Sequence, residues 1–338
     1  MQPGNISQTV WRRSILKQLR QGAVSSLPLK CSESEMCAAI PGDGGFFVAA
    51  DATVCGNTHY TGIYAAIKAL NDLMTRGAEP VAVQVSLTLP VRIKETDVQK
   101  LISVLKEFCE ENGVAIASVR AEVQAALRQT MVHVSAIGQA GEEQLLRLEQ
   151  AAPEQDIILC GSIALEGMQR ILDECEEELK ERFVPAFLRQ MKALKKELFV
   201  GEAIQSAWGH VSAMQQIGNG GIFATLWEVA EAAGLGLTVD LSQMTVCQET
   251  IEVCEFYRLN PYQMTSTGGV LMLTEDGESL LQILRGCGVR ASRLGRTEKG
   301  KTRKIINGGE SRFLDRPAPD ELALWQEKRL MESEYKQL

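Results

Sequence analysis

The sequence lacks the features of a zinc protein, a membrane protein and a secreted protein. Its nine cysteines lie singly along the chain, and none forms the CxxC pair that zinc sites use. A membrane-spanning helix needs about 18 consecutive apolar residues, and no apolar run in the sequence is that long. The amino terminus carries Arg12, Arg13 and Lys17 but no apolar segment behind them, unlike a signal peptide. We therefore expect a cytoplasmic protein with reduced thiols and no membrane contact.

Positive charge and histidine are also scarce. The chain has 35 Lys and Arg residues against 43 Asp and Glu residues, a net charge of −8, so nucleic acid is not an expected partner. The three histidines, His59, His133 and His210, have neither the spacing of a metal site nor that of a catalytic triad. Structural roles are favoured for them.

The composition that remains is that of a globular protein with mixed secondary structure. Hydrophobic residues make up 45% and charged residues 23% of the 338 positions. A chain of this length favours two domains of roughly 150 residues each. Strand-like and helix-like patterns occur in both halves, which predicts an α+β or α/β fold. A Gly- and Glu-rich stretch separates the halves, so we predict one domain over residues 1–151 and a second over residues 152–338.

The segment ALNDLMTRGAEP, residues 69–80, is the most informative part of the first half. Apolar residues recur at helical spacing over residues 60–76, and a glycine and a proline then end the helix. At about 100° per residue Asp72 falls opposite the apolar stripe, so it is predicted to point away from the helix's own core. The next strand alternates and should leave a polar sheet face for water, a ligand or a partner. Its predicted apolar face holds Val81, Val83, Val85, Leu87 and Leu89.

A Gly-rich break, QIGNGG over residues 216–221, precedes a predicted helix in the second half. Gly218, Gly220 and Gly221 would let backbone N–H groups approach a ligand, and the amino terminus of a helix favours anions. A plain connector is the alternative. If the break is an anion cradle, Gly221→Val is expected to impair ligand binding more than folding. The run PGDGG at 41–45 links two β-like segments and is interpreted as a turn.

Six basic residues lie close together near the carboxyl end. We predict a hairpin over residues 289–306 that carries them along a solvated edge. The six are Arg293, Arg296, Lys299, Lys301, Arg303 and Lys304.

The order of these segments and their amino-acid sequences resemble the aminoimidazole-ribonucleotide synthetase (AIR synthase) superfamily over nearly the whole chain. The strongest piece is ALNDLMTRGAEPVAVQVSLTLP, similar to the family's Asn-Asp helix, Gly-Ala-x-Pro and alternating strand. Three further segments look most like the hydrogenase-maturation, HypE-like branch: NGGIFATLWEVAEAAGLGLTVDL, CEFYRLNPYQMTSTGGVLML and GGESRFLDRPAPDEL. The resemblance implies an amino-terminal mixed sheet with helices that pairs in a homodimer, and a carboxyl-terminal αβ sandwich domain. It also implies ATP in a cleft bordered by the first sheet, with magnesium on its phosphates.

Particular residues follow from the resemblance. Glu35, Asp51 and Asp72 match acidic positions of the family and become candidate magnesium ligands, because carboxylate oxygens suit this cation. A simple turn residue is the alternative for Asp51, and a solvated surface residue for Asp72. The residues implied for nucleotide binding are Asp51, Asn71, Asp72, Arg120, Gly218, Asn219, Gly220 and Gly221.

The sequence also departs from the family. Arg120 and Gln216 stand where two further family acids are expected, and Glu35 is the only acid left of an upstream pair. Fewer carboxylates and an added cation weaken a magnesium clamp, but they leave a direct contact between Arg120 and phosphate open. The chain ends MESEYKQL, without the terminal cysteine that carries the carbamoyl group in the hydrogenase-maturation enzyme. Carbamoyl dehydratase activity is therefore not expected.

Two hypotheses about function remain. The first is an ATP- or purine-nucleotide-binding relative of the hydrogenase maturation factor with a partly degraded Mg-ATP site. Any reaction would then be ATP-dependent phosphoryl transfer or dehydration-type ligase chemistry. The rival is a non-catalytic dimeric scaffold, or pseudoenzyme, that binds a protein partner.

Overall fold

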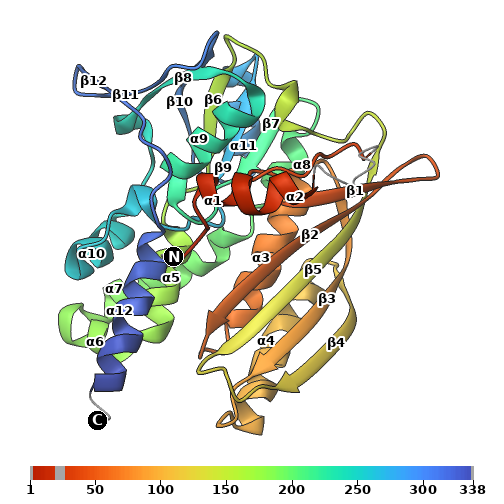
Figure 1. Cartoon of the computed structure of the whole chain (residues 1–338). Coiled ribbons are helices and arrows are strands. Elements are labelled where there is room, and N and C mark those ends of the chain that lie inside the picture. The colour runs from red at the N-terminus through yellow and green to blue at the C-terminus, as the bar shows by residue number, and fades with distance from the viewer. Residues whose placement is uncertain (1–2, 20–26, 336–338) are drawn as a thin grey trace.

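Two sheets organise the chain, one in each half, and helices pack against both (Figure 1). The structure is a computed structural model and describes residues 3–19 and 27–335. The two sheets and their helices form a mixed α/β architecture, as the alternation of strand-like and helix-like patterns predicted. The predicted boundary between residues 151 and 152 falls in the segment that leads from the first sheet to the second.

The first sheet has five strands in the order β1-β2-β5-β3-β4. Only the β3–β4 pair is parallel, so the sheet is mixed. The PGDGG run forms the tight turn between β1 and β2, as expected, with Gly42 opposite Gly45. The strands are β1 (Cys37–Gly42), β2 (Gly45–Gly56), β3 (Glu79–Leu89), β4 (Ala115–Val123) and β5 (Thr130–Gly141).

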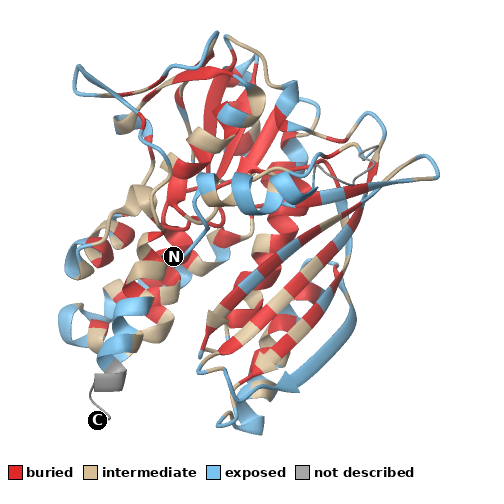
Figure 2. Ribbon diagram, viewed as in Figure 1, coloured by how far each residue is buried: buried red, intermediate tan, exposed pale blue. Residues whose placement is uncertain are grey.

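Helices α3 (Thr61–Met74) and α4 (Glu95–Glu111) belong to the first half, and α3 packs against β2 and β5. Side chains along the strands therefore alternate between buried and more exposed, which gives the banded colouring of this sheet in Figure 2. The opposite sheet face is open in the single chain. Val81, predicted on the buried face of β3, is 52% exposed because the register with β5 shifts between Pro80 and Ala82.

Among the described residues, three short helical segments precede the first sheet. They are α1 (Gln8–Trp11), the π-helical η1 (Arg12–Leu16) and α2 (Lys17–Leu19).

The second sheet has seven strands in the order β12-β11-β8-β10-β6-β9-β7. The predicted hairpin over residues 289–306 is wrong, because β8 lies between β10 and β11 and pairs with both. The basic residues therefore do not line a sheet edge together: Arg296 pairs with Asp156 on β6, and Arg303 is buried. The strands are β6 (Asp156–Cys160), β7 (Ala213–Gln216), β8 (Gly236–Asp240), β9 (Val270–Thr274), β10 (Ala291–Glu298), β11 (Arg303–Asn307) and β12 (Glu310–Phe313).

Helices of the second half surround this sheet and extend beside the first half (Figure 1). The α-helices are α5 (Leu165–Glu174), α6 (Glu176–Arg182), α7 (Pro185–Ala193), α8 (Gly201–Ala207), α9 (Gly221–Ala233), α10 (Gln248–Tyr257), α11 (Gly277–Gly286) and α12 (Glu321–Tyr335). The 3-10 turns are η2 (Leu148–Gln150), η3 (Leu194–Leu198), η4 (Leu241–Gln243) and η5 (Pro261–Gln263). Across residues 3–19 and 27–335, none of the helices combines the length and the apolar character needed to traverse a bilayer.

Helix α3 joins the two halves. All of its residues except Ile63 and Lys68 are buried, because the second half covers the face that the sheet does not. Asn71 donates a hydrogen bond from Nδ2 to the carbonyl of Leu198 at 3.0 Å, and Trp208 donates from Nε1 to the carbonyl of Met74 at 3.0 Å. The alternative that Asp72 is a solvated surface residue is therefore wrong, because Asp72 is 6% exposed.

Candidate functional site

Asp72 lies on the last turn of α3, where β7 covers it. The residue is 6% exposed, and its Oδ1 accepts a 2.7 Å hydrogen bond from Nε2 of Gln216. Burial raises the pKa of Asp72 to about 6, although the positive charge of Lys68 and the Gln216 hydrogen bond oppose the shift. Asp72 does point away from the sheet, as its helical position predicted, but it meets protein there instead of open solvent.

Glu35 lies beside a buried arginine. Arg76 is 1% exposed, and its Nε is 3.0 Å and 3.2 Å from the two carboxylate oxygens of Glu35. Its Nη1 donates to the carbonyl of Met214 at 2.8 Å, and its Nη2 donates to Oε1 of Gln215 at 2.7 Å. Glu35 therefore neutralises a guanidinium that links α3 to the second half, because a buried charge needs a partner.

The Gly-rich break forms the start of α9. Gly220 and Gly221 have φ values of +85° and +69°, a region that strongly favours glycine. A Cβ on Gly221 would lie 2.5 Å from the carbonyl oxygen of Tyr262, whereas a Cβ on Gly218 would meet nothing within 4 Å. Gly221→Val is therefore expected to disturb folding as well as ligand binding, and Gly218 is the glycine of the break that can be changed.

The first backbone groups of α9 already have partners. The N–H of Gly220 donates to Oδ2 of Asp320 at 2.8 Å. Asn219 accepts a hydrogen bond from Nζ of Lys68 at 3.1 Å and donates from Nδ2 to Oδ1 of Asn5 at 3.1 Å. Lys68 thus connects Asn219 to the surroundings of Asp72, whose pKa its charge lowers.

A cavity of about 500 Å³ lies over this break. Four of its lining residues are acidic, and among the described residues no lysine or arginine lines it. Burial, with a smaller contribution from the charge of Glu33, raises the pKa of Glu228 to about 8. The acidic residues are Glu33, Glu35, Glu228 and Asp320; Asn219, Gly220, Asn5 and Trp11 also line the cavity.

Asp51 and Arg120 lie elsewhere, on the open face of the first sheet. Asp51 is 62% exposed, and its Oδ1 lies 3.5 Å from Nε2 of His133, whose Nδ1 is hydrogen-bonded to Oγ1 of Thr53. Arg120 is 77% exposed and pairs with Glu122 on its own strand at 3.2 Å. Within one chain, these two residues do not join the cavity.

The predicted metal ligands are therefore distributed over different environments. Glu35 is bound to Arg76, Asp72 is buried beside Gln216, and Asp51 is on the open sheet face. Within residues 3–19 and 27–335, no three His, Cys, Asp or Glu side chains are grouped in a way that would hold a metal ion. Magnesium binding by these three carboxylates stays a prediction.

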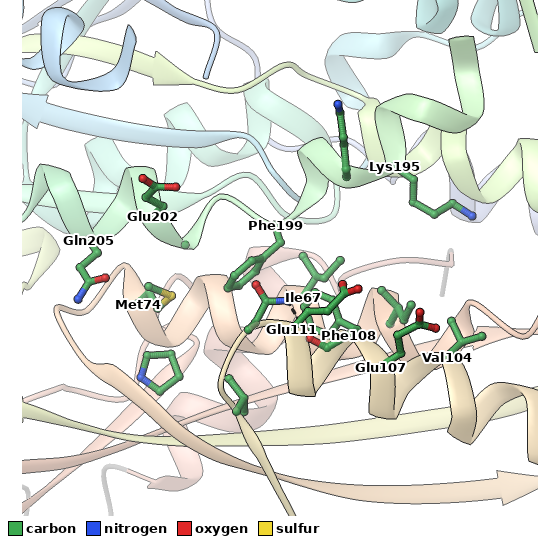
Figure 3. Close-up of a pocket in the computed structure, with 16 residues that line it drawn as sticks. Ile67, Met74, Val104, Glu107, Phe108, Glu111, Lys195, Phe199, Glu202 and Gln205 are labelled. Carbon is green, nitrogen blue, oxygen red and sulfur yellow. Dashed lines mark hydrogen bonds between the residues drawn. The ribbon is translucent and has the colours of Figure 1, made fainter. Parts of the chain in front are cut away.

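A larger hollow of about 710 Å³ lies between α3 and α4 on one side and η3 and α8 on the other (Figure 3). Phe108 and Phe199 face each other there, edge to face, with ring centroids 5.5 Å apart. Lys195 is held by Asp173 at 2.6 Å and lies over the ring of Tyr60. None of the site residues predicted from the sequence lines this hollow.

Comparison with known proteins identifies the class of this chain. The model of the AIR synthase related protein N-terminal domain matches residues 34–140, and that of the AIR synthase related protein C-terminal domain matches residues 152–307. The chain belongs to the AIR synthase related family.

Its relatives by sequence are hydrogenase-maturation proteins, and the chain is close to HypE. It is 27% identical over 222 residues to a protein of Methanocaldococcus jannaschii named for hydrogenase expression/formation. That match covers 64% of this chain but only 63% of the relative's length. The carbamoyl dehydratase HypE of Cupriavidus necator is 21% identical over 293 residues, which cover 83% of this chain and 81% of that protein.

Solved structures share the fold. Escherichia coli HypE, a hydrogenase maturation protein, has a TM-score of 0.71 at 17% identity, covering 92% of this chain and 99% of that chain. HypE in complex with ATP has a TM-score of 0.67 at 15% identity, covering 95% and 98%. The structure named AaThiL, complexed with AMPPCP and TMP, has a TM-score of 0.70 at 14% identity, covering 93% and 96%.

Proposed function

We propose that this protein binds a purine nucleotide, ATP, with its phosphates at the start of α9. The observation that carries the proposal is the hydrogen bond from the Gly220 N–H to the carboxylate of Asp320, because this backbone position already holds an anionic group. The partial positive charge at the amino terminus of a 13-residue helix favours the same kind of ligand. The ATP complex of HypE and the AMPPCP complex named AaThiL support a nucleotide as the ligand class.

We further propose that magnesium contributes little to this binding. The carboxylates that would hold it are Glu35 and Asp72 in one region and Asp51 in another, and two of the three are hydrogen-bonded within the protein. Magnesium clamps on polyphosphates need several oxygen ligands around one ion. A phosphate held by backbone N–H groups does not have this requirement.

We also propose a homodimer formed through the open face of the first sheet. Polar and apolar side chains alternate with the buried ones there, and Phe47 and Ile137 are exposed on neighbouring strands. Two sheets can pack face to face about 10 Å apart and bury such a surface. Asp51 and Arg120 would then lie within the paired sheets, which is the arrangement in which they contribute to a shared nucleotide site.

The rival proposal is a scaffold that binds a protein partner and no nucleotide. It is favoured by Gln216, which replaces an expected acid and donates a hydrogen bond to Asp72. The structure of a HypE–HypF complex supports a protein partner for a relative of this chain.

A thermal-shift series with ATP, ADP and AMP, each with EDTA and with magnesium, tests these proposals. A ligand that binds only the native state raises its stability by RT ln(1 + [L]/Kd). The nucleotide proposal predicts a rise in Tm that grows with ATP concentration in both buffers. No shift with any nucleotide up to millimolar concentration favours the scaffold.

A further inference from the structure

The carboxylate of Asp320 joins the starts of two helices. Its Oδ2 accepts the hydrogen bond from the N–H of Gly220 at the start of α9, and its Oδ1 accepts one from the N–H of Ala323 in the first turn of α12 at 3.1 Å. The residue is only 3% exposed and also lines the 500 Å³ cavity. A side chain 100 positions away in the sequence thus fills the place where α9 attracts a negative group.

We propose that Asp320 is an internal competitor for the anion position of α9, so that a phosphate binds there only after the Asp320 carboxylate has left. This inference rests on the proposed function, because it names what the nucleotide must displace. The Gly220 N–H is a single donor, and a phosphate oxygen that accepts from it would lie beside the carboxylate oxygen. Two negative groups at this separation repel each other strongly in a site shielded from water.

The other residues that line the cavity favour competition between phosphate and the Asp320 carboxylate, and disfavour the two being present together. Glu33 and Glu35 also line it, and their ion-pair partners, Arg12 at 2.7 Å and Arg76 at 3.0 Å, are not lining residues. The Glu228 carboxyl has no hydrogen-bond or ion-pair partner among the described residues, and burial raises its pKa to about 8. A polyphosphate that entered while Asp320 stayed in place would lie beside this carboxylate, with Arg12 and Arg76 already paired to Glu33 and Glu35.

The chain around Asp320 limits which part has to move. Leu314 is buried and its N–H donates to the carbonyl of Arg303 at 2.9 Å, while Leu322 is buried on α12. Between these anchors, Pro317, Ala318, Pro319 and Asp320 all line the cavity. Residues 315–320 form a short strap whose last four residues line the cavity. The Asp320 carbonyl also accepts a hydrogen bond from the N–H of Leu324 on α12 at 3.0 Å, so the competing carboxylate would leave by rotation of its side chain and not by movement of the strap alone.

Titration calorimetry with inorganic pyrophosphate in EDTA tests the competition. Asp320→Asn keeps the size of the side chain but removes its charge, so we expect about tenfold tighter pyrophosphate binding than in the native protein. Asp315→Asn makes the same chemical change at an exposed position of the same strap and should leave the affinity unchanged. Equal affinity in the native and Asp320→Asn proteins would overturn the inference.

Anion rescue gives a second readout that does not depend on nucleotide binding. Asp320→Ala leaves the N–H groups of Gly220 and Ala323 without their acceptor, so we expect a lower Tm. Phosphate at tens of millimolar should restore more of this loss than it adds to the native protein or to Asp315→Ala. If phosphate rescues Asp320→Ala but no variant binds ATP, the inference about Asp320 stands and the nucleotide proposal is rejected. If all variants bind ATP equally and phosphate rescues none, the nucleotide proposal stands and the inference about Asp320 is rejected. If there is neither ATP binding nor rescue, both are rejected.

Discussion

Gln216 donates a 2.7 Å hydrogen bond from its side-chain amide to the carboxylate of Asp72 and thereby joins β7 to α3. The resemblance to the AIR synthase family led us to expect an acid at position 216. Two carboxylates at this distance would repel each other unless a cation lay between them. Because Gln216 is neutral and donates a hydrogen bond to Asp72, no cation is needed between these two side chains. This is the clearest physical reason to expect a weakened magnesium site.

The buried Asp72 carboxylate should make stability depend on pH. Burial raises its pKa from an ordinary value of 3.8 to about 6, so this group favours folding fully below about pH 4 and loses that contribution as the pH rises through 6. Above pH 6 its ionisation costs the native state roughly 3 kcal/mol, at about 1.4 kcal/mol per pKa unit. We expect Asp72→Asn to raise Tm at pH 7.5, with a gain that disappears below pH 4.

Thermal unfolding of the native, Asp72→Asn and Asp43→Asn proteins between about pH 3 and 8 measures this effect. Asp43 is exposed in the β1–β2 turn and provides the matched control. A lower Tm for Asp72→Asn at pH 7.5 would show that the ionised carboxylate stabilises the fold.

Two glycines of the break should respond differently to the same substitution. A side chain at Gly218 meets nothing within 4 Å, so Gly218→Val should change Tm by only a few degrees while lowering ATP affinity at least about tenfold. Gly221→Val would place its Cβ 2.5 Å from a backbone oxygen and should strongly destabilise the protein. Circular-dichroism melting followed by ATP titration separates the two effects. If Gly218→Val binds ATP as well as the native protein does, the break is only a connector.

The open face of the first sheet should hold the homodimer together. Ile137 on the central strand β5 is exposed in the single chain, and a lysine there would place a charge between the paired sheets. We expect light scattering to give twice 37.1 kDa for the native protein at micromolar concentration and a single chain for Ile137→Lys. Val184→Lys, at an exposed apolar position before α7, should remain dimeric. A native protein that is monomeric removes this claim.

Arg120 tests whether the paired sheet contributes to the nucleotide site. We expect Arg120→Asp to lower metal-free ATP affinity by roughly one to two orders of magnitude, on the about 1.5–3 kcal/mol scale of a hydrogen bond to a charged group. Arg92→Asp, at an exposed position after β3, makes the same change of charge as a control. Calorimetry in EDTA compares them. If Arg120→Asp binds ATP with the affinity of the native protein, Arg120 has no role in nucleotide binding and forms only its ion pair with Glu122.

Local sequence patterns predicted where helices, strands and turns occur, but they did not predict which elements lie next to each other in space. The β1–β2 turn at 41–45 and the helix over residues 60–76 follow from glycine and apolar spacing, and both are confirmed. The insertion of β8 between β10 and β11 was missed because strand order depends on contacts that are distant along the chain. The predicted hairpin satisfied every local rule.

The same limit applies to the candidate site. The sequence pointed to Asp72 and the Gly-rich break, and Lys68 interacts with both, through its hydrogen bond to Asn219 and through its charge near Asp72. Arg76 and Asp320 were missed. An arginine after a helix usually indicates solvent, and the buried state of Arg76 depends on Glu35 and on carbonyl groups of β7. No local pattern relates Asp320 to Gly220.

Titration calorimetry of the native protein with ATP, first in EDTA and then in excess magnesium, is the most direct test of metal-independent nucleotide binding. We expect one ATP per chain in both buffers, with affinities that differ by less than about threefold, because the proposed phosphate contacts are backbone N–H groups at the start of α9 and not a metal. No binding heat at millimolar ATP, or binding that requires magnesium, would contradict this expectation.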